Sequence, residues 1–212
     1  MDQNLLALLF GAIFVNNIIL MRFLGLCPFF GVSTRLSTAI GMSGAVLFVM
    51  TFATWITWGV YRLLLAPGSI LLAGLLPQTL FPQGLVFLET VSFILIIASL
   101  VQLLEMFLKK FVPVLYSSLG IYLPLITTNC AILGVAIIVA DNNYSFVSGT
   151  VFAVGTSIGF ALVMILFAAL RERLELAPIS KSFKGYPIAF IAASLISIAF
   201  LGFTNMFGIS PS

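Results

Sequence analysis

Six long apolar segments constrain the fold of this chain more than any other feature of its sequence. They cover approximately residues 4–24, 38–61, 86–108, 114–139, 146–170 and 187–207. A helix of about 20 mostly apolar residues is long enough to cross a bilayer. Only 7% of the residues are charged, whereas soluble domains carry roughly 25%. We therefore predict an all-α integral membrane protein with six transmembrane helices, forming a single membrane domain over residues 1–212.

Lys and Arg are distributed unevenly among the predicted connections. The first, third and fifth connections carry almost all of them, the second has only Arg62, and the fourth connection and both termini have none. Because cytoplasmic loops are enriched in Lys and Arg, we expect the odd-numbered connections in the cytoplasm and both termini on the outer side. Residues 1–4 lack the basic n-region of a signal peptide, so the first apolar segment is expected to remain in the protein. Arg22 is expected to extend to the cytoplasmic surface.

The sequence contains no histidine and only two cysteines. This chain therefore supplies no histidine for haem ligation, for zinc, for a proton relay or as the base of a serine hydrolase. Two thiols cannot complete a four-thiolate site, so any such site must take ligands from another chain. The net charge of +3 comes from sparse residues at loop edges and does not indicate nucleic-acid binding.

The two cysteines occupy matching sequence frames. Cys27 and Cys130 each begin the pattern Cys-x-x-x-Gly-Val, and a shift of 103 residues superimposes them. The match predicts a duplication, with repeat one over about residues 1–110 and repeat two over about residues 111–212. Three spans per repeat give the two halves opposite orientations, as in many transporters with sites near the membrane midplane.

Straight first and fourth helices would hold the two thiols far apart, with Cys27 near the cytoplasmic face and Cys130 toward the outer face. The local sequences, 23–28 around Cys27 and 123–130 up to Cys130, contain Gly25, Pro28 and Pro124 and permit a break in each helix. Broken backbone at membrane depth must be buried in protein or face water, and polar partners are available at Asn16, Asn17, Thr127, Thr128 and Asn129. We predict two half-helix hairpins that enter from opposite faces and bring the cysteines near the midplane.

Residue chemistry alone leaves several roles open for the thiols. Cysteine is often a small buried hydrophobic residue, and a disulfide is a second alternative. The third is metal or cluster ligation, because thiolates select zinc, copper(I) or iron–sulfur. Two thiols here and two from a similar partner suit an iron–sulfur cluster with four cysteines.

Other polar or small residues in the spans have ordinary structural interpretations. Glu89 lies near the outer end of the third segment, and Glu105 is expected to pair with Lys109 four residues later. Residues 171–173 are expected to be a solvated helix end. The small residues at 155–159 are expected to permit close helix packing.

Both cysteine segments closely resemble the A subunits of the bacterial Rnf electron-transport complex. The matching stretches are residues 15–17, 22–29, 31–33, 101–102, 105–106, 119–136 and 166–174. The E and D subunits of the sodium-pumping NADH:quinone oxidoreductase form a related family. The residues at 16–17 and 26–29 resemble the Rnf A subunits more than that family. The connection at residues 64–84 is longer than usual for the family.

The resemblance implies a subunit of a ferredoxin:NAD oxidoreductase complex that moves Na⁺ or H⁺ across the bacterial or archaeal cytoplasmic membrane. It implies that this chain and a homologous six-helix partner, similar to the E subunit of the Rnf complex, each give two cysteines to one [2Fe–2S] cluster inside the membrane. Here those ligands are Cys27 and Cys130. The NAD, flavin and ferredoxin sites are expected on other subunits, so the chain is not catalytic alone. The alternatives are a secondary transporter with a midplane substrate site and structural cysteines, and a scaffold subunit that anchors redox partners.

Overall fold

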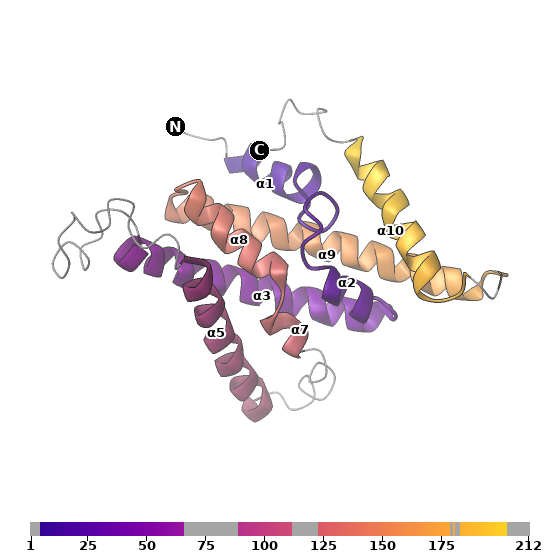
Figure 1. Cartoon of the computed structure of the whole chain (residues 1–212), viewed down its shortest axis with the longest axis horizontal. Helices are drawn as coiled ribbons and strands as arrows, with labels where there is room; N and C mark the ends of the chain where they lie inside the picture. The colour runs from indigo at the N-terminus through magenta and orange to yellow at the C-terminus, as the bar shows by residue number, and fades with distance from the viewer. Residues whose placement is uncertain (1–4, 66–88, 112–122, 179, 181–182, 203–212) are drawn as a thin grey trace.

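The computed structural model describes residues 5–65, 89–111, 123–178, 180 and 183–202. Every regular element in these ranges is helical, which confirms the prediction of an all-α chain for them. In chain order (Figure 1) the elements are α1 (Leu5–Phe10), the π-helix η1 (Gly11–Val15), α2 (Leu26–Val32), α3 (Leu36–Val60), the π-helix η2 (Tyr61–Leu65), α5 (Glu89–Phe111), α7 (Leu123–Thr127), α8 (Cys130–Asp141), α9 (Phe146–Leu176) and α10 (Tyr186–Leu201).

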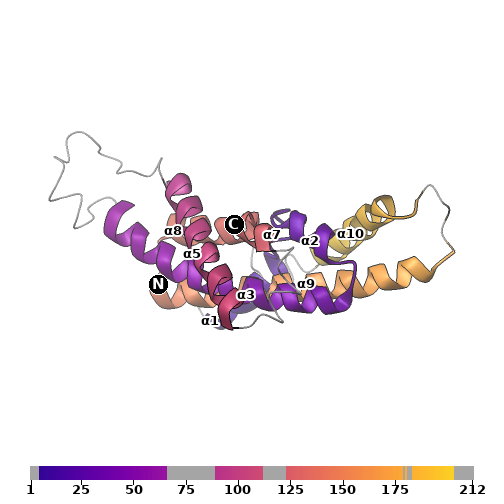
Figure 2. The same cartoon turned by 90° about the horizontal axis from the view of Figure 1, so that it is seen from below.

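Two long antiparallel helices, α3 and α9, form the centre of the fold. The backbone N–H of Leu36, at the start of α3, donates to Glu172 Oε1 near the end of α9 at 2.8 Å. At the other end, Trp55 Nε1 donates to Thr150 Oγ1 at 3.0 Å. Figure 2 shows both helices along the lower side of the view, with α7, α2 and α10 above them and α5 crossing α3.

Within the described residues, two helical stretches are long and apolar enough to cross a membrane. They are Leu36–Leu63, of 28 residues, and Phe146–Leu176, of 31 residues. At about 1.5 Å per residue, they extend for about 42 and 46 Å, more than the roughly 30 Å of a hydrocarbon core. The segments predicted at 86–108 and 187–207 correspond to α5 and α10. The described apolar stretches in them, Thr90–Leu103 and Tyr186–Leu201, are shorter than those of α3 and α9.

The first and fourth predicted spans are interrupted, as expected. Helix η1 ends at Val15, residues 16–25 form turns, and α2 then begins. The first break thus starts at Asn16, earlier than the expected break around Gly25. Helix α7 ends at Thr127 and α8 begins at Cys130. An interruption therefore precedes each cysteine.

The expectation of a half-helix hairpin at the first break is wrong. On the N-terminal side of the break, Ala12 lies against Gly155 and Ile13 against Gly159. Beyond the break, the ring of Phe29 stacks on Phe167 with a centroid distance of 4.2 Å. The chain therefore advances along α9 in one direction before and after the break, and the element is an interrupted helix that does not turn back.

Close approach of backbones holds the first half of this interrupted helix against α9. A Cβ added at Gly159 would lie 2.8 Å from Ile13 O, and one at Gly155 would lie 3.1 Å from the Cβ of Ala12. Any side chain at Gly159 would force the helices apart, because real Cβ atoms do not approach that closely. The expectation that the small residues at 155–159 allow close packing is confirmed.

Buried amide side chains satisfy the broken backbone. Asn17 is fully buried; its Nδ2 donates to Gly159 O at 2.9 Å and to Ile13 O at 3.2 Å, and its Oδ1 accepts from Ile19 N at 3.2 Å. At the second break, Asn129 Oδ1 accepts from Ala131 N at 3.0 Å and caps α8. These bonds match the expectation that Asn17 and Asn129 serve as partners, since buried backbone groups must be paired.

The region around Arg171 differs from the expected solvated helix end. Helix α9 continues to Leu176, and Arg171 is only half-exposed. Its Nη1 donates to Phe30 O at 2.8 Å and to Ser33 Oγ at 2.9 Å, at the C-terminal end of α2. The next residue, Glu172, accepts from the first N–H of α3. Together these two side chains fix the corner between α2 and α3 to α9, since helix ends leave backbone groups that need partners.

Candidate functional site

The two helix breaks meet opposite the middle of α9. A Cβ built on Gly25 would lie 3.1 Å from Asn129 Oδ1, 3.1 Å from the Cβ of Ala131 and 3.0 Å from Phe160 Cε2. Gly25 also has a φ of +80°, which side chains rarely adopt. Phe160 is close to the centre of the 31-residue helix α9. The segments that carry Cys27 and Cys130 are therefore in direct contact at mid-length of that helix.

From this contact the two cysteine-bearing helices run in opposite directions. Helix α2 extends toward Arg171, as its contacts with Phe167 and Arg171 indicate. Helix α8 extends toward the start of α9, because Val139 Cγ1 would lie 3.1 Å from a Cβ at Gly149. Each cysteine lies in the first turn of its helix.

The glycines of the two Cys-x-x-x-Gly-Val motifs also face the opposite break. A Cβ at Gly134, on α8, would lie 2.6 Å from Leu24 Cδ1, just before α2. A Cβ at Gly31, on α2, would lie 3.7 Å from Leu125 Cδ1 on α7. A side chain at Gly134 would therefore require the flexible end of the Leu24 side chain to move. The contact places α8 directly against the residues of the first break.

Both cysteines are exposed and free. Cys130 Sγ is 3.9 Å from Thr128 O, a weak contact. The two helix breaks are buried, but the sulfur-bearing side chains lie at the surface of the chain. Exposed thiols can bind a metal centre that a second protein also ligates. Their exposure does not fit the alternative that the cysteines are small buried hydrophobic residues.

The donor set fits half of a four-thiolate centre. The described part of the chain contains no cluster of three or more His, Cys, Asp or Glu side chains, and the sequence has no further cysteine. An iron–sulfur centre of the [2Fe–2S] type takes four cysteine ligands. Cys27 and Cys130 can supply two of them. The side chains of Glu89, Glu105 and Lys109 lie outside the described residues, so the expected pair between Glu105 and Lys109 stays a prediction.

Two polar groups near this region have no hydrogen-bond partner among the described residues. They are Nδ2 of Asn129, next to Cys130, and Oγ1 of Thr156 on α9, and both are buried. Sequence reasoning selected Asn129 as a backbone partner but gave no reason to select Thr156. It also missed Arg171 and Phe160, whose partners are more than 120 residues away and leave no local sequence pattern.

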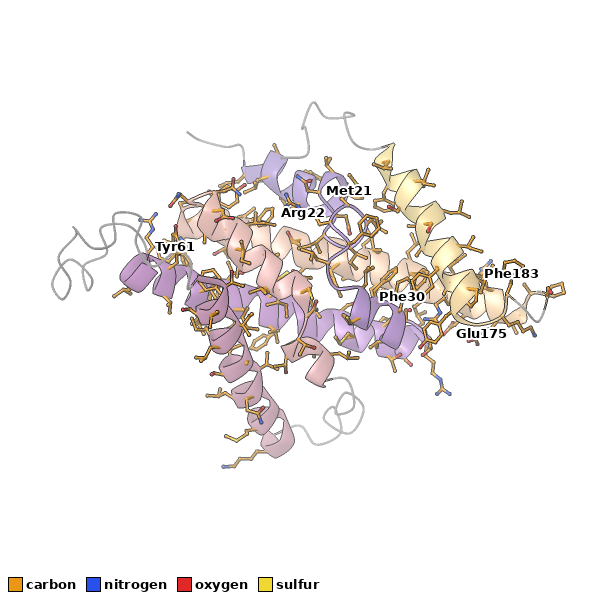
Figure 3. All side chains as sticks on the ribbon, viewed as in Figure 1. Met21, Arg22, Phe30, Tyr61, Glu175 and Phe183 are labelled. Carbon is orange, nitrogen blue, oxygen red and sulfur yellow. The ribbon has the colours of Figure 1, made fainter. Side chains whose placement is uncertain are left out.

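Arg22 does not extend toward the end of α9 that the sequence predicts to be cytoplasmic. It lies in the turns between η1 and α2, and Figure 3 shows it far from Glu175 at the C-terminal end of α9. Burial raises the pKa of the Tyr144 hydroxyl in the α8–α9 connection, and the charge of Arg22 partly offsets this rise. Arg22 therefore lies nearer the opposite end of α9 from Arg35. In the first connection, only Arg35 supports the predicted membrane orientation.

Comparison with known proteins gives the family of this chain. Residues 5–207 match a family described as "Rnf-Nqr subunit, membrane protein". The chain is 50% identical over 204 residues to the A subunit of the ion-translocating oxidoreductase complex of Syntrophotalea carbinolica, covering 96% of this chain and 98% of the relative. It is also 50% identical, with the same coverage, to the A subunit of the Na⁺-translocating ferredoxin:NAD⁺ oxidoreductase complex of Acetobacterium woodii. The chain therefore belongs to the Rnf-Nqr family of membrane proteins.

Proposed function

We propose that this chain is the A subunit of an ion-translocating ferredoxin:NAD⁺ oxidoreductase complex and relays electrons through a cluster inside the membrane. The names of the two relatives at 50% identity support the complex and the reaction. One structural observation supports the relay: two exposed thiols lie beside a contact between two helix breaks at mid-length of α9. The chain acts as one subunit of a redox-driven translocase and is not catalytic alone.

The proposed ligands of the cluster are Cys27 and Cys130, with two further cysteines from a homologous partner similar to the E subunit of the Rnf complex. A bound [2Fe–2S] cluster supplies one-electron oxidation and reduction at this position. The residues of this chain position the thiols. Gly25 allows the two breaks to approach, and Asn17 and Asn129 pair the interrupted backbone. Each cysteine lies in the first turn of a half-helix that points away from the contact.

The proposed coupling follows from where the thiols lie. They are near the middle of a helix that exceeds the thickness of a hydrocarbon core, and are therefore far from both aqueous surfaces. A negative charge added there is poorly screened, so the attraction of a cation toward the same depth is strong. Electron arrival at this site would thus favour entry of Na⁺ or H⁺ from one side. This coupling is a hypothesis, and ion uptake by vesicles with each cysteine replaced tests it.

The membrane arrangement proposed for the chain is a single domain of six spans in two inverted repeats. Under the shift of 103 residues, α3 corresponds to the first part of α9 and α2 to α8. Both pairs run in opposite directions, which supports the inversion. The proposed orientation in the cytoplasmic membrane has both termini on the outer side. A membrane-impermeant maleimide applied to intact cells should label Asn142→Cys but not Thr34→Cys; the reverse pattern would refute this orientation.

Replacement of the cysteines tests the proposed ligation. The whole complex carrying Cys27→Ala or Cys130→Ala should lose the iron and acid-labile sulfide of one [2Fe–2S] cluster, the corresponding electron paramagnetic resonance signal, and ferredoxin:NAD⁺ turnover. Ser37→Ala is the control, because Ser37 is exposed in the first turn of α3 and its removal should leave all three unchanged. Full iron content and turnover in both cysteine variants would refute the assignment.

A secondary transporter is the second candidate, and the interrupted helices favour it. Broken helices at mid-depth form substrate sites in many transporters. This alternative predicts solute uptake by the purified chain in vesicles and unchanged transport after replacement of both cysteines. The electron-relay proposal predicts iron only when the homologous partner is present.

A further inference from the structure

A pocket with charged and apolar lining lies where α9 ends and α10 begins, away from the cysteine region. It has a volume of about 360 Å³, and its lining residues are Arg171, Leu174, Glu175, Lys184, Gly185, Ile188 and Ala189. Two cationic residues and one carboxylate thus border the same space. Figure 3 shows Glu175 and Phe183 together at this end of the molecule. The excess positive charge favours a ligand with an anionic group, and Arg and Lys both recognise phosphate.

The pocket continues into an apolar groove between the same two helices. Leu174 and Ile188 line both, and the groove, of about 350 Å³, extends along α10 through Ala192 and Leu195 to Ala199. Figure 1 shows α10 diverging from α9 from their shared end. Apolar side chains lie on both sides of this space, so water in it would be poorly bound.

The length of the groove identifies the kind of ligand that it suits. Ile188 and Ala199, at its two ends on α10, are eleven residues apart, which is about 16 Å at 1.5 Å per residue. That is close to one leaflet, half of the roughly 30 Å hydrocarbon core. A cationic opening at the end of a groove one leaflet deep matches an amphiphile with an anionic head and an apolar chain.

We propose that this site binds one glycerophospholipid, with its phosphate between Arg171 and Lys184 and one acyl chain along α10. A spanning helix of a partner protein is a poorer match, because such a helix needs apolar contact through both leaflets and places no anion at the opening. Arg171 also donates to Phe30 O and Ser33 Oγ. The bound phosphate therefore contacts the side chain that holds the end of α2.

Lipid binding by the intact complex tests this proposal. The complex, purified in detergent, is titrated with dioleoyl phosphatidylglycerol, and native mass spectrometry counts the retained lipid. Lys184→Gln should weaken binding about fivefold, since one Lys contributes about that factor toward an anionic lipid. Ala192→Phe should fill the groove and abolish retention. Arg173→Gln, which removes an exposed charge from the same helix end outside the pocket, should leave binding unchanged.

Several results would overturn the proposal. Equal retention of dioleoylglycerol, which lacks the phosphate, would exclude recognition of the head group. Displacement by inorganic phosphate alone would indicate a site for a free anion. Equal loss in Lys184→Gln and Arg173→Gln would indicate a general charge effect. A cross-link from Leu195→Cys to a neighbouring protein, instead of to a photoreactive lipid, would identify a protein as the occupant. Unchanged iron content and melting temperature in each variant confirm that it has folded.

Discussion

Gly25 lies against Asn129, so closely that a Cβ on Gly25 would come within 3.1 Å of Asn129 Oδ1. This contact joins two helix breaks that are more than 100 residues apart in the chain. Cys27 follows one break and Cys130 follows the other. The approach of the two thiol-bearing half-helices therefore depends on the absence of a side chain at residue 25.

Gly25→Ala should separate the two breaks. The positive φ costs an L-residue about 1–2 kcal/mol, and the added methyl group must displace Phe160, Ala131 or Asn129, an overpacking effect of roughly 1–3 kcal/mol. We expect a lower melting temperature of the complex and a reduced iron content. Calorimetry with iron analysis on one preparation measures both.

The matched control for this variant is Gly44→Ala on α3. Gly44 has no atoms within 4 Å of an added Cβ, and alanine is the better helix former by about 1 kcal/mol. This control should preserve iron and stability. Identical behaviour of the two variants would mean that Gly25 has no special role.

Asn17→Ala should destabilise the first break. It leaves Ile19 N without its side-chain acceptor and removes the donor to Gly159 O, both in a buried region. An unsatisfied buried group costs about 1–3 kcal/mol, so hydrogen exchange at residues 16–25 should accelerate about tenfold or more. Asn142→Ala is the control, because Asn142 is exposed and its Nδ2 bonds only to Ile138 O within its own helix end. Equal exchange rates in the two variants would contradict the structural role of Asn17.

Arg171→Ala should loosen the C-terminal end of α2. Hydrogen bonds to a charged group contribute about 1.5–3 kcal/mol each, and this residue donates to Phe30 O and Ser33 Oγ. With iron removed from the complex, Cys27 should react faster with a maleimide while Cys130 is unchanged. Arg171→Lys should restore part of the protection, since Lys keeps the charge but not the planar guanidinium. Acceleration at both cysteines would indicate general unfolding. Lys184→Gln keeps Arg171 but should weaken lipid binding, so it shows whether loss of lipid alone changes the reactivity of Cys27.

The helix breaks could be predicted from the sequence because their causes are local. Gly25, Pro28 and Pro124 disfavour continuous helix, and Asn17 and Asn129 supply the polar groups that an interrupted backbone needs. The matching cysteine motifs indicated which breaks belong together. The motifs also predict that the two repeats have opposite orientations, and the antiparallel order of α3 and α9 agrees with that prediction.

Other features depend on contacts distant in sequence and could not be predicted. The sequence predicts that Arg171 is exposed to solvent, whereas the structure shows it bonded at the C-terminal end of α2. Its partners are 141 and 138 residues away, so no local sequence pattern indicates them. The direction of the chain after the first break depends on the packing of Phe29 on Phe167. The exposure of the thiols follows from which face each half-helix presents, and helical periodicity in a uniformly apolar segment carries no information about that face.

Electron cryomicroscopy of the complete complex tests the central claim most directly. The proposal predicts metal density within bonding distance of the sulfur atoms of both Cys27 and Cys130, bounded on its other side by two cysteines of a homologous partner. A map in which these two sulfur atoms contact only lipid or protein, with no metal between this chain and its neighbour, would contradict the account.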